Sequence, residues 1–286
     1  GKVIIFLSLT VTAPPTRLRV SATRDFNETS IRFTLDTTGL GPGIQPSWNF
    51  GNLLASTTQV DYPVAPDGQG RIASTNYTLM VQNTASCATT ITQNFVVDFT
   101  LEGHCLGMPT RFHDASRITG AGISRWQWNF GDGNTSNNQH PTHVYAQPGT
   151  YWVSLTVGSS LAGGHQASYT LRRRVDIFPV VKVSEQSHYQ ENFETASGSH
   201  HWISHGVVDS AGGKQLDQSS WQLQNGAWAT TANQATGVNA DAGATYFASE
   251  QSYLESPCFD LTALPRPMLS FRYTLDTDPG GDGVVL

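Results

Sequence analysis

Three runs between residues 126 and 157 decide the fold: WQWNFGDG at 126–133, HPTHVY at 140–145 and PGTYWVSLTV at 148–157. In the first run aromatic side chains alternate with polar ones, and in the third run aliphatic side chains do the same. Each run can therefore bury one face as a β-strand. The GDG and PG steps supply tight turns, because glycine tolerates positive φ and aspartate can hydrogen-bond its own backbone. The stretch predicts a small β-sandwich and carries no obvious catalytic chemistry.

These runs closely resemble the landmarks W-x-F-G-D-G, H-x-Y and P-G-x-Y-x-V-x-L-x-V of the polycystic kidney disease (PKD) domain, an immunoglobulin-like extracellular module. The positions that carry the resemblance are Trp126, Trp128, Phe130, Gly131, Asp132, Gly133, His143, Tyr145, Pro148, Gly149 and Tyr151. The resemblance implies an all-β sandwich over residues 101–179. It gives His143 a structural role, in which the imidazole bonds a neighbouring loop. It implies a module rather than an activity.

The preceding segment repeats this pattern at an offset of about eighty residues. Ser47 to Asn52 aligns with Gln127 to Asp132, so Trp48 and Phe50 correspond to Trp128 and Phe130. Similarity at a nearly fixed period indicates tandem copies of one unit. We therefore expect a degenerate PKD-like sandwich over residues 13–100, in line with the second copy. We also expect the two copies to form a stiff rod with separate cores.

Composition restricts the classes of function. Only 13% of the residues are charged and the formal net charge is −6, which argues against nucleic-acid binding, because phosphates require concentrated Lys and Arg. The basic run Arg172 to Arg174 is expected to be the solvated part of an edge strand. The apolar run at 3–11 is too short to span a bilayer as a helix. We expect residues 1–12 to be the last strand of a preceding module, and therefore no membrane span.

From Val180 the amino-acid composition changes: the sequence contains several Trp residues and is rich in Gly, Ala and Asn. Residues 185–286 resemble a jelly-roll module of very large surface proteins from gliding Bacteroidetes-type bacteria. An E-x-F-E opening, an S-Y-L-x-S-P-C-F-D segment and a final D-G-x-V-L strand carry this resemblance. It implies a partial jelly-roll domain over 180–286, and the whole chain is expected to be all-β.

A calcium site is one candidate for chemistry in this last region. The carboxylates that could supply it are Asp276, Asp278, Asp282, Glu191 and Glu194. Clustered acidic oxygens suit Ca²⁺, which takes six to eight oxygen ligands. A plain acidic hairpin turn explains the same residues. We expect the hairpin turn and no bound cofactor.

Other candidates have plain structural explanations. His188, His200, His201 and His205 lack helical spacing, so a solvated loop is expected there rather than a metal site. The indoles of Trp202, Trp221 and Trp228 could contact glycans or fill a sandwich core. Three cysteines cannot all pair within one chain. A bridge between Cys87 and Cys105 is not expected, because it would have to span a strand of roughly 30 Å.

No hydrolase or phosphate-loop signature is present, so we expect no enzymatic activity and no catalytic residues. The sequence indicates an extracellular stalk or adhesion segment of a large secreted or surface-attached protein. Its expected partners are neighbouring domains of the same long chain and an extracellular glycan or protein ligand. The alternative is a set of accessory modules of a secreted hydrolase whose catalytic domain lies outside this chain.

Overall fold

A computed structural model describes residues 13–24, 30–64, 72–191, 202–210, 213–216, 221–224, 227–230 and 250–270. Within these ranges the chain forms β-strands and one 3₁₀ turn, η1 (Ala162–Gly164), which confirms the predicted all-β class. Residues 1–12 and four of the calcium candidates, namely Glu194, Asp276, Asp278 and Asp282, lie outside the described residues.

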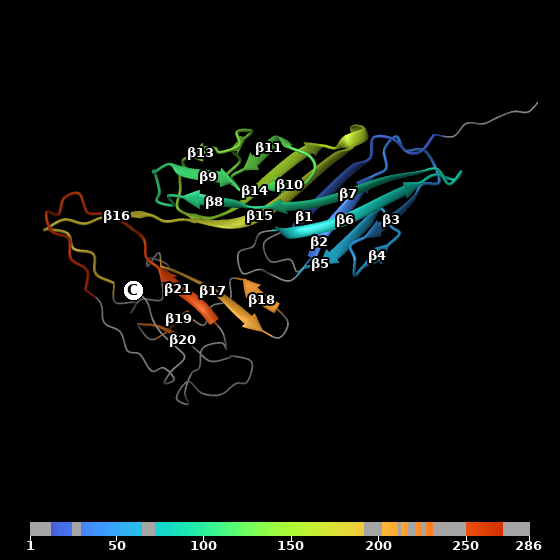
Figure 1. Cartoon of the computed structure of the whole chain (residues 1–286). Helices are drawn as coiled ribbons and strands as arrows, with labels where there is room; N and C mark the ends of the chain where they lie inside the picture. Colours follow the sequence, from blue (N-terminus) through green and yellow to red (C-terminus); the bar gives the residue numbers. More distant parts are fainter. Residues whose placement is uncertain are drawn as a thin grey trace, which may run out of the picture.

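The largest sheet of the described residues contains seven strands and crosses both halves of the expected tandem (Figure 1). Its order is β12 (Thr135–Ser136), β11 (Ile123–Asn129), β14 (Gly149–Ser160), β15 (Gln166–Ile177), β1 (Arg19–Arg24), β2 (Ser30–Asp36) and β5 (Gln59–Pro63). The pair β1 and β15 is parallel, and it joins the two segments.

Two further sheets complete the sandwich. One has the order β10 (Arg117–Ile118), β7 (Ala88–Val97), β6 (Ile72–Gln82), β3 (Gln45–Asn49) and β4 (Leu54–Ala55). The other has the order β13 (Thr142–His143), β9 (Thr110–Asp114) and β8 (Phe99–Glu102). Here β10 of the second segment pairs with β7 of the first. Each segment therefore contributes a strand to a sheet of the other, because β1 of the first segment pairs with β15 of the second.

Period-two burial explains why these runs are strands. In β14 the side chains of Val153, Leu155 and Val157 have no exposed surface, while the residues between them are partly exposed. The strand continues into β15 through η1, where Gly163 and Gly164 have φ of 74° and 79°. Glycine adopts this left-handed conformation without a Cβ penalty, which permits the reversal.

The buried side chains form one contiguous cluster that contains both Trp48 and Trp128. The rings of Phe95 and Tyr169 join the two halves by stacking with centroids 3.8 Å apart. The expectation of separate cores in a rod of independent sandwiches is therefore wrong. The cause is the shared sheet, because β15 brings Tyr169 against the first segment. The boundaries near residues 100 and 180 stay a prediction.

The C-terminal region contributes three small sheets among the described residues. They are β16 (Val180–Lys182) with β22 (Cys258–Asp260), then β18 (Gly213–Leu216) with β17 (Ile203–Ser210) and β21 (Glu250–Glu255), and finally β19 (Trp221–Gln224) with β20 (Ala227–Thr230). A disulfide joins Cys105 to Cys258 across a sequence separation of 153 residues, with the Cα atoms 5.8 Å apart. Cys87 forms no disulfide. The jelly-roll stays a prediction.

Candidate functional site

The turn after β11 positions the residues that carry the strongest sequence pattern. The Asn129 Oδ1 atom accepts the Gly131 backbone N–H at 2.9 Å, and the Phe130 N–H donates to the Asn134 carbonyl at 3.0 Å. Gly131 has φ of 84°, and a Cβ added there would lie 2.8 Å from the Trp152 carbonyl oxygen. A side chain at this position would therefore collide with the backbone of β14, so the turn requires glycine.

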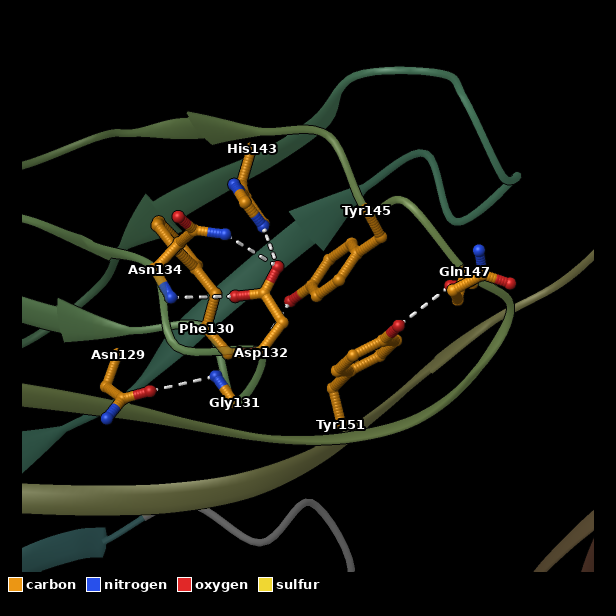
Figure 2. A network of polar contacts seen from close by, with 9 residues as sticks. All are labelled: Asn129, Phe130, Gly131, Asp132, Asn134, His143, Tyr145, Gln147 and Tyr151. Atoms are coloured by element: carbon orange, nitrogen blue, oxygen red, sulfur yellow. Dashed lines mark hydrogen bonds and ion pairs between the residues drawn. The ribbon is translucent and has the colours of Figure 1, made fainter.

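Asp132 lies at the centre of a polar network in this turn (Figure 2). Its Oδ1 atom accepts the Asn134 backbone N–H at 3.0 Å, and its Oδ2 atom accepts the Asn134 amide at 3.0 Å. The same Oδ2 atom lies 2.7 Å from His143 Nε2. Burial raises the pKa of Asp132, but the hydrogen bonds from Asn134 and His143 outweigh it, so the net pKa is lowered.

Aromatic rings enclose this network. The His143 imidazole stacks on Phe130 with centroids 4.3 Å apart, and the edge of Tyr145 meets it at 4.6 Å. The Tyr145 hydroxyl donates to the Phe130 carbonyl at 3.1 Å, and burial raises the pKa of Tyr145. Next to it, the Tyr151 hydroxyl donates to the Gln147 carbonyl at 2.8 Å. The network therefore ties β11, β13 and β14 together at one end of the sandwich.

The Asp132–His143 pair resembles two members of a hydrolytic triad, but its surroundings do not suit catalysis. In the described part of the chain, the contacts of His143 are with Asp132, Phe130 and Tyr145, and none of these supplies an activated nucleophile. The side chains of His143 and Asp132 are only 13% and 17% exposed. A mutually satisfied cluster whose central side chains are largely covered fixes loops rather than binding a substrate.

The paired tryptophans make matching contacts in the two segments. The Trp128 indole N–H donates to the Asn138 carbonyl at 3.0 Å, and the Trp48 indole N–H donates to the Thr57 carbonyl at 2.8 Å. Both side chains are fully buried, and Phe50 lies beside Trp48 with centroids 6.1 Å apart. The first segment has Asn52 in place of Asp132.

Four other predicted positions have local structural roles. The Trp126 indole N–H donates to Asp114 Oδ2 at 2.7 Å, and Trp126 is half-buried. Gly149 begins β14 directly after Pro148 and has φ of 142°. Gly133 closes the Asp132 turn with φ of 92°.

The structure brings together few of the residues considered for ligand binding. Searching the described residues finds no group of three His, Cys, Asp or Glu side chains able to hold a metal ion. Of the calcium candidates only Glu191 is described, and the Tyr189 hydroxyl lies 3.5 Å from its Oε2 atom. The Trp202 indole N–H donates to the Tyr189 hydroxyl at 2.9 Å. Trp221 and Trp228 lie in β19 and β20, and their side chains are outside the described set.

A shallow hollow on the outer face of the seven-stranded sheet was missed by sequence reasoning. It has a volume of about 350 Å³ and is lined by Asn129, Gly131, Gly133, Thr150, Trp152, Ser154 and Arg172. The Arg172 guanidinium lies over the Trp152 ring at 5.0 Å from its centroid. This cation–π contact occupies one face of the indole, and Trp152 stays partly exposed. The outward position of Trp152 in the alternating run was the available signal.

The basic run of β15 is not uniformly solvated. The Arg173 side chain is 17% exposed, pairs with Asp98, and donates to the Phe99 carbonyl at 2.7 Å. Its guanidinium also lies 4.5 Å from the centroid of the Phe99 ring. The prediction of a solvated run is therefore wrong for Arg173, because this side chain points towards the interior where β8 begins.

Residues 102–175 match the family model of the PKD domain. This segment is a PKD domain. A stretch of 51 residues is 47% identical to collagenase ColA of Bacillus cereus, which is 18% of this chain and 5% of the collagenase. The chain therefore spans only a small part of that curated relative.

Two solved structures are also similar to the chain. The PKD1 domain of Vibrio anguillarum Epp is 26% identical, with a TM-score of 0.24, and the match covers 29% of this chain and 94% of that domain. The three N-terminal domains of the bacteriophage RB49 outer capsid protein Hoc are 9% identical, with a TM-score of 0.23, over 86% of this chain and 87% of that chain.

None of the described segments forms a helix with the length and hydrophobicity that a membrane crossing requires.

Proposed function

We propose that the chain is a non-catalytic stalk segment of a large extracellular protein, either secreted or attached to the cell surface. The closed Asp132–His143 network carries this proposal, because the polar groups of the PKD signature bond one another and leave no activated nucleophile. Its partners are then neighbouring domains of the same chain and an extracellular glycan or protein. The partial jelly-roll over 180–286 is proposed as the module that contacts such a ligand.

The disulfide supports the extracellular location. Disulfides persist in oxidising compartments and are rare in the cytosol. The bond between Cys105 and Cys258 ties the PKD domain to the C-terminal region, which suits a protein that works outside the cell.

A specific observation favours a second function, which belongs to another class. The 51-residue similarity to a collagenase supports an accessory role, in which the chain positions a hydrolase on its substrate. In that case the catalytic domain belongs to another part of the parent protein.

An attachment assay tests these functions. Beads coated with the full chain are washed over immobilised collagen, polysaccharides and host-cell surfaces, and the released fragments of each surface are measured. A stalk or adhesion segment retains beads on a glycan or cell surface without releasing fragments. An accessory module retains beads on a polymeric substrate such as collagen. Cleavage of any substrate by the purified chain would overturn the non-catalytic proposal.

A further inference from the structure

The first described strand of the chain pairs with the last strand of the PKD domain. β1 lies beside β15 in parallel, with six residue pairs from Arg19 opposite Gln166 to Arg24 opposite Leu171 (Figure 1). In a sandwich that is complete in itself, β1 would be expected to find its partners within its own segment. Here β1 pairs with β2 of its own segment on one side and with β15 of the PKD domain on the other, so the two segments share one sheet.

Hydrogen bonds fix the start of this pair. The Leu18 backbone N–H donates to His165 Nδ1 at 3.0 Å, and the Gln166 backbone N–H donates to the Leu18 carbonyl at 2.9 Å. Just before Leu18, the Asn83 side-chain amide donates to the Ala13 carbonyl at 2.9 Å. The chain is therefore anchored to the sandwich before β1 begins.

The inner face of the pair is part of the core. Val20 and Ala22 of β1 are 3% and 1% exposed, and Tyr169 of β15 is fully buried. The Tyr169 ring stacks on Phe95, and its hydroxyl lies 3.2 Å from the Tyr77 hydroxyl. Separating β1 from β15 therefore breaks backbone hydrogen bonds and exposes apolar surface at the same time.

The parallel direction decides how this pair responds to tension. The chain enters β1 at its first residue and leaves β15 at its last residue, so the two points of load lie at opposite ends of the pair. Tension pulls the strands past each other along their common axis, and the hydrogen bonds of the pair share the load. In an antiparallel hairpin loaded at its open end, the bonds break one after another.

Load from the C-terminal side reaches the same end of β15. The Phe178 N–H donates to the His104 carbonyl at 2.8 Å, and the Leu106 N–H donates to the Phe178 carbonyl at 2.7 Å. Between these residues, the Cys105–Cys258 disulfide joins the C-terminal region covalently to this point. Tension from either route therefore enters the sandwich at the C-terminal end of β15.

We propose that β1 and β15 form a shear clamp that makes the two segments a single load-bearing unit. The clamp follows from strand direction and pairing, so it does not depend on the stalk or accessory role proposed above. It adds a mechanical function: the clamp keeps the described strands between β1 and β15 from unfolding until the β1–β15 pair separates.

Single-molecule force spectroscopy on the full chain, held by its two ends, tests the clamp. The variant Ser168→Pro removes a backbone N–H from β15, and the matched control Ser168→Ala keeps it. Alternate residues of a strand direct their N–H groups to the same neighbour. Since Gln166 donates towards β1, the N–H of Ser168 also faces β1. At constant tension, Ser168→Pro should unfold about tenfold faster, the equivalent of ~1.4 kcal/mol, and Ser168→Ala should unfold at the wild-type rate.

A cross-link keeps the test decisive where the proline variant folds poorly. Ser21 and Ser168 are opposite each other in the pair, so Ser21→Cys with Ser168→Cys can form a disulfide across it. A Cys87→Ser background removes a competing thiol. The cross-linked chain should lose the first unfolding event under tension, because β1 can no longer slide along β15.

The direction of pulling separates a clamp from a general effect on stability. Attachment at the N-terminal end of the chain and through Ala162→Cys, in the exposed turn before β15, loads both strands of the pair at the same end, so the pair unzips instead of shearing. Along this direction the wild-type pair should separate at a lower force than in end-to-end pulling, because its hydrogen bonds break one after another, whereas a general effect on stability predicts equal forces. The clamp is refuted by equal rates for Ser168→Pro and Ser168→Ala in end-to-end pulling, or by an unchanged first event in the cross-linked chain. It is also refuted by equal separation forces in the two directions.

Discussion

Trp128→Ala should lower the free energy of unfolding by about 4 kcal/mol, within the range of 3–5 kcal/mol found for large aromatic residues in cores. The Trp128 side chain has no exposed surface, and its ring meets Phe99 and Phe112 with centroids 5.2 and 5.4 Å away. Alanine would empty this space and leave the Asn138 carbonyl without the indole donor, which by itself costs about 1 kcal/mol. Small domains have total stabilities of roughly 5–15 kcal/mol, so the loss is large.

Urea denaturation followed by fluorescence or circular dichroism measures this change. With a denaturant dependence of about 2 kcal/mol per molar, the midpoint should fall by roughly 2 M. Trp152→Ala is the matched control, since Trp152 lies in the adjacent strand β14 and is 36% exposed. The control should shift the midpoint by a small fraction of the Trp128→Ala value, because its ring loses mainly the contact with Arg172. Equal shifts for the two variants would contradict the assignment of Trp128 to the core.

Three further predictions concern the turn, its titration and the disulfide. Gly131→Ala should destabilise the fold by about 1–3 kcal/mol in the same urea assay, because φ is 84° and the new Cβ would meet the Trp152 backbone; an unchanged midpoint would contradict this. The folded state lowers the pKa of the Asp132 carboxyl, so this carboxylate stabilises the fold above the unfolded pKa near 3.9, and the stabilisation is lost as pH falls through the folded pKa. The melting temperature of Asp132→Ala should therefore depend less on pH in the acid range than that of the wild type. Melting temperatures that fall in parallel for the two proteins would contradict this prediction. Cys105→Ser should increase the length of the fully unfolded chain in force spectroscopy by roughly 500 Å, because the disulfide no longer holds together a loop of 153 residues at about 3.3–3.6 Å per residue. An unchanged length would show that the disulfide does not carry the load.

Local patterns in the sequence determined the strands and turns of the PKD domain. The period-two alternation of Val153, Leu155 and Val157 fixes which face of β14 is buried, because successive side chains of a strand point to opposite sides. The GDG turn is likewise local, since Gly131 and Asp132 bond within a few residues of themselves. The offset of about eighty residues placed Trp48 and Trp128 at matching positions, and both make the same kind of indole–carbonyl contact.

The sequence could not determine the partners of the side chains in the candidate site. The pattern singled out Asp132, His143 and Tyr145, but their enclosure by Phe130 depends on the meeting of three strands. The same limit applies to Trp152, whose outward position is local and whose contact with Arg172 comes from the neighbouring strand.

Only the tertiary structure decided how the two segments join. β1 pairs with β15, whose residues lie far along the chain, and hydrophobic alternation in either strand is equally satisfied by another neighbour. Cys105 pairs with Cys258 for a similar reason: cysteine spacing leaves connectivity open, and a closed loop of 153 residues has no local signal. The sequence therefore determined which faces are buried and where the chain turns, because these depend on neighbouring residues. Strand partners and the disulfide depend on contacts between distant residues, which exist only once the whole sandwich has folded.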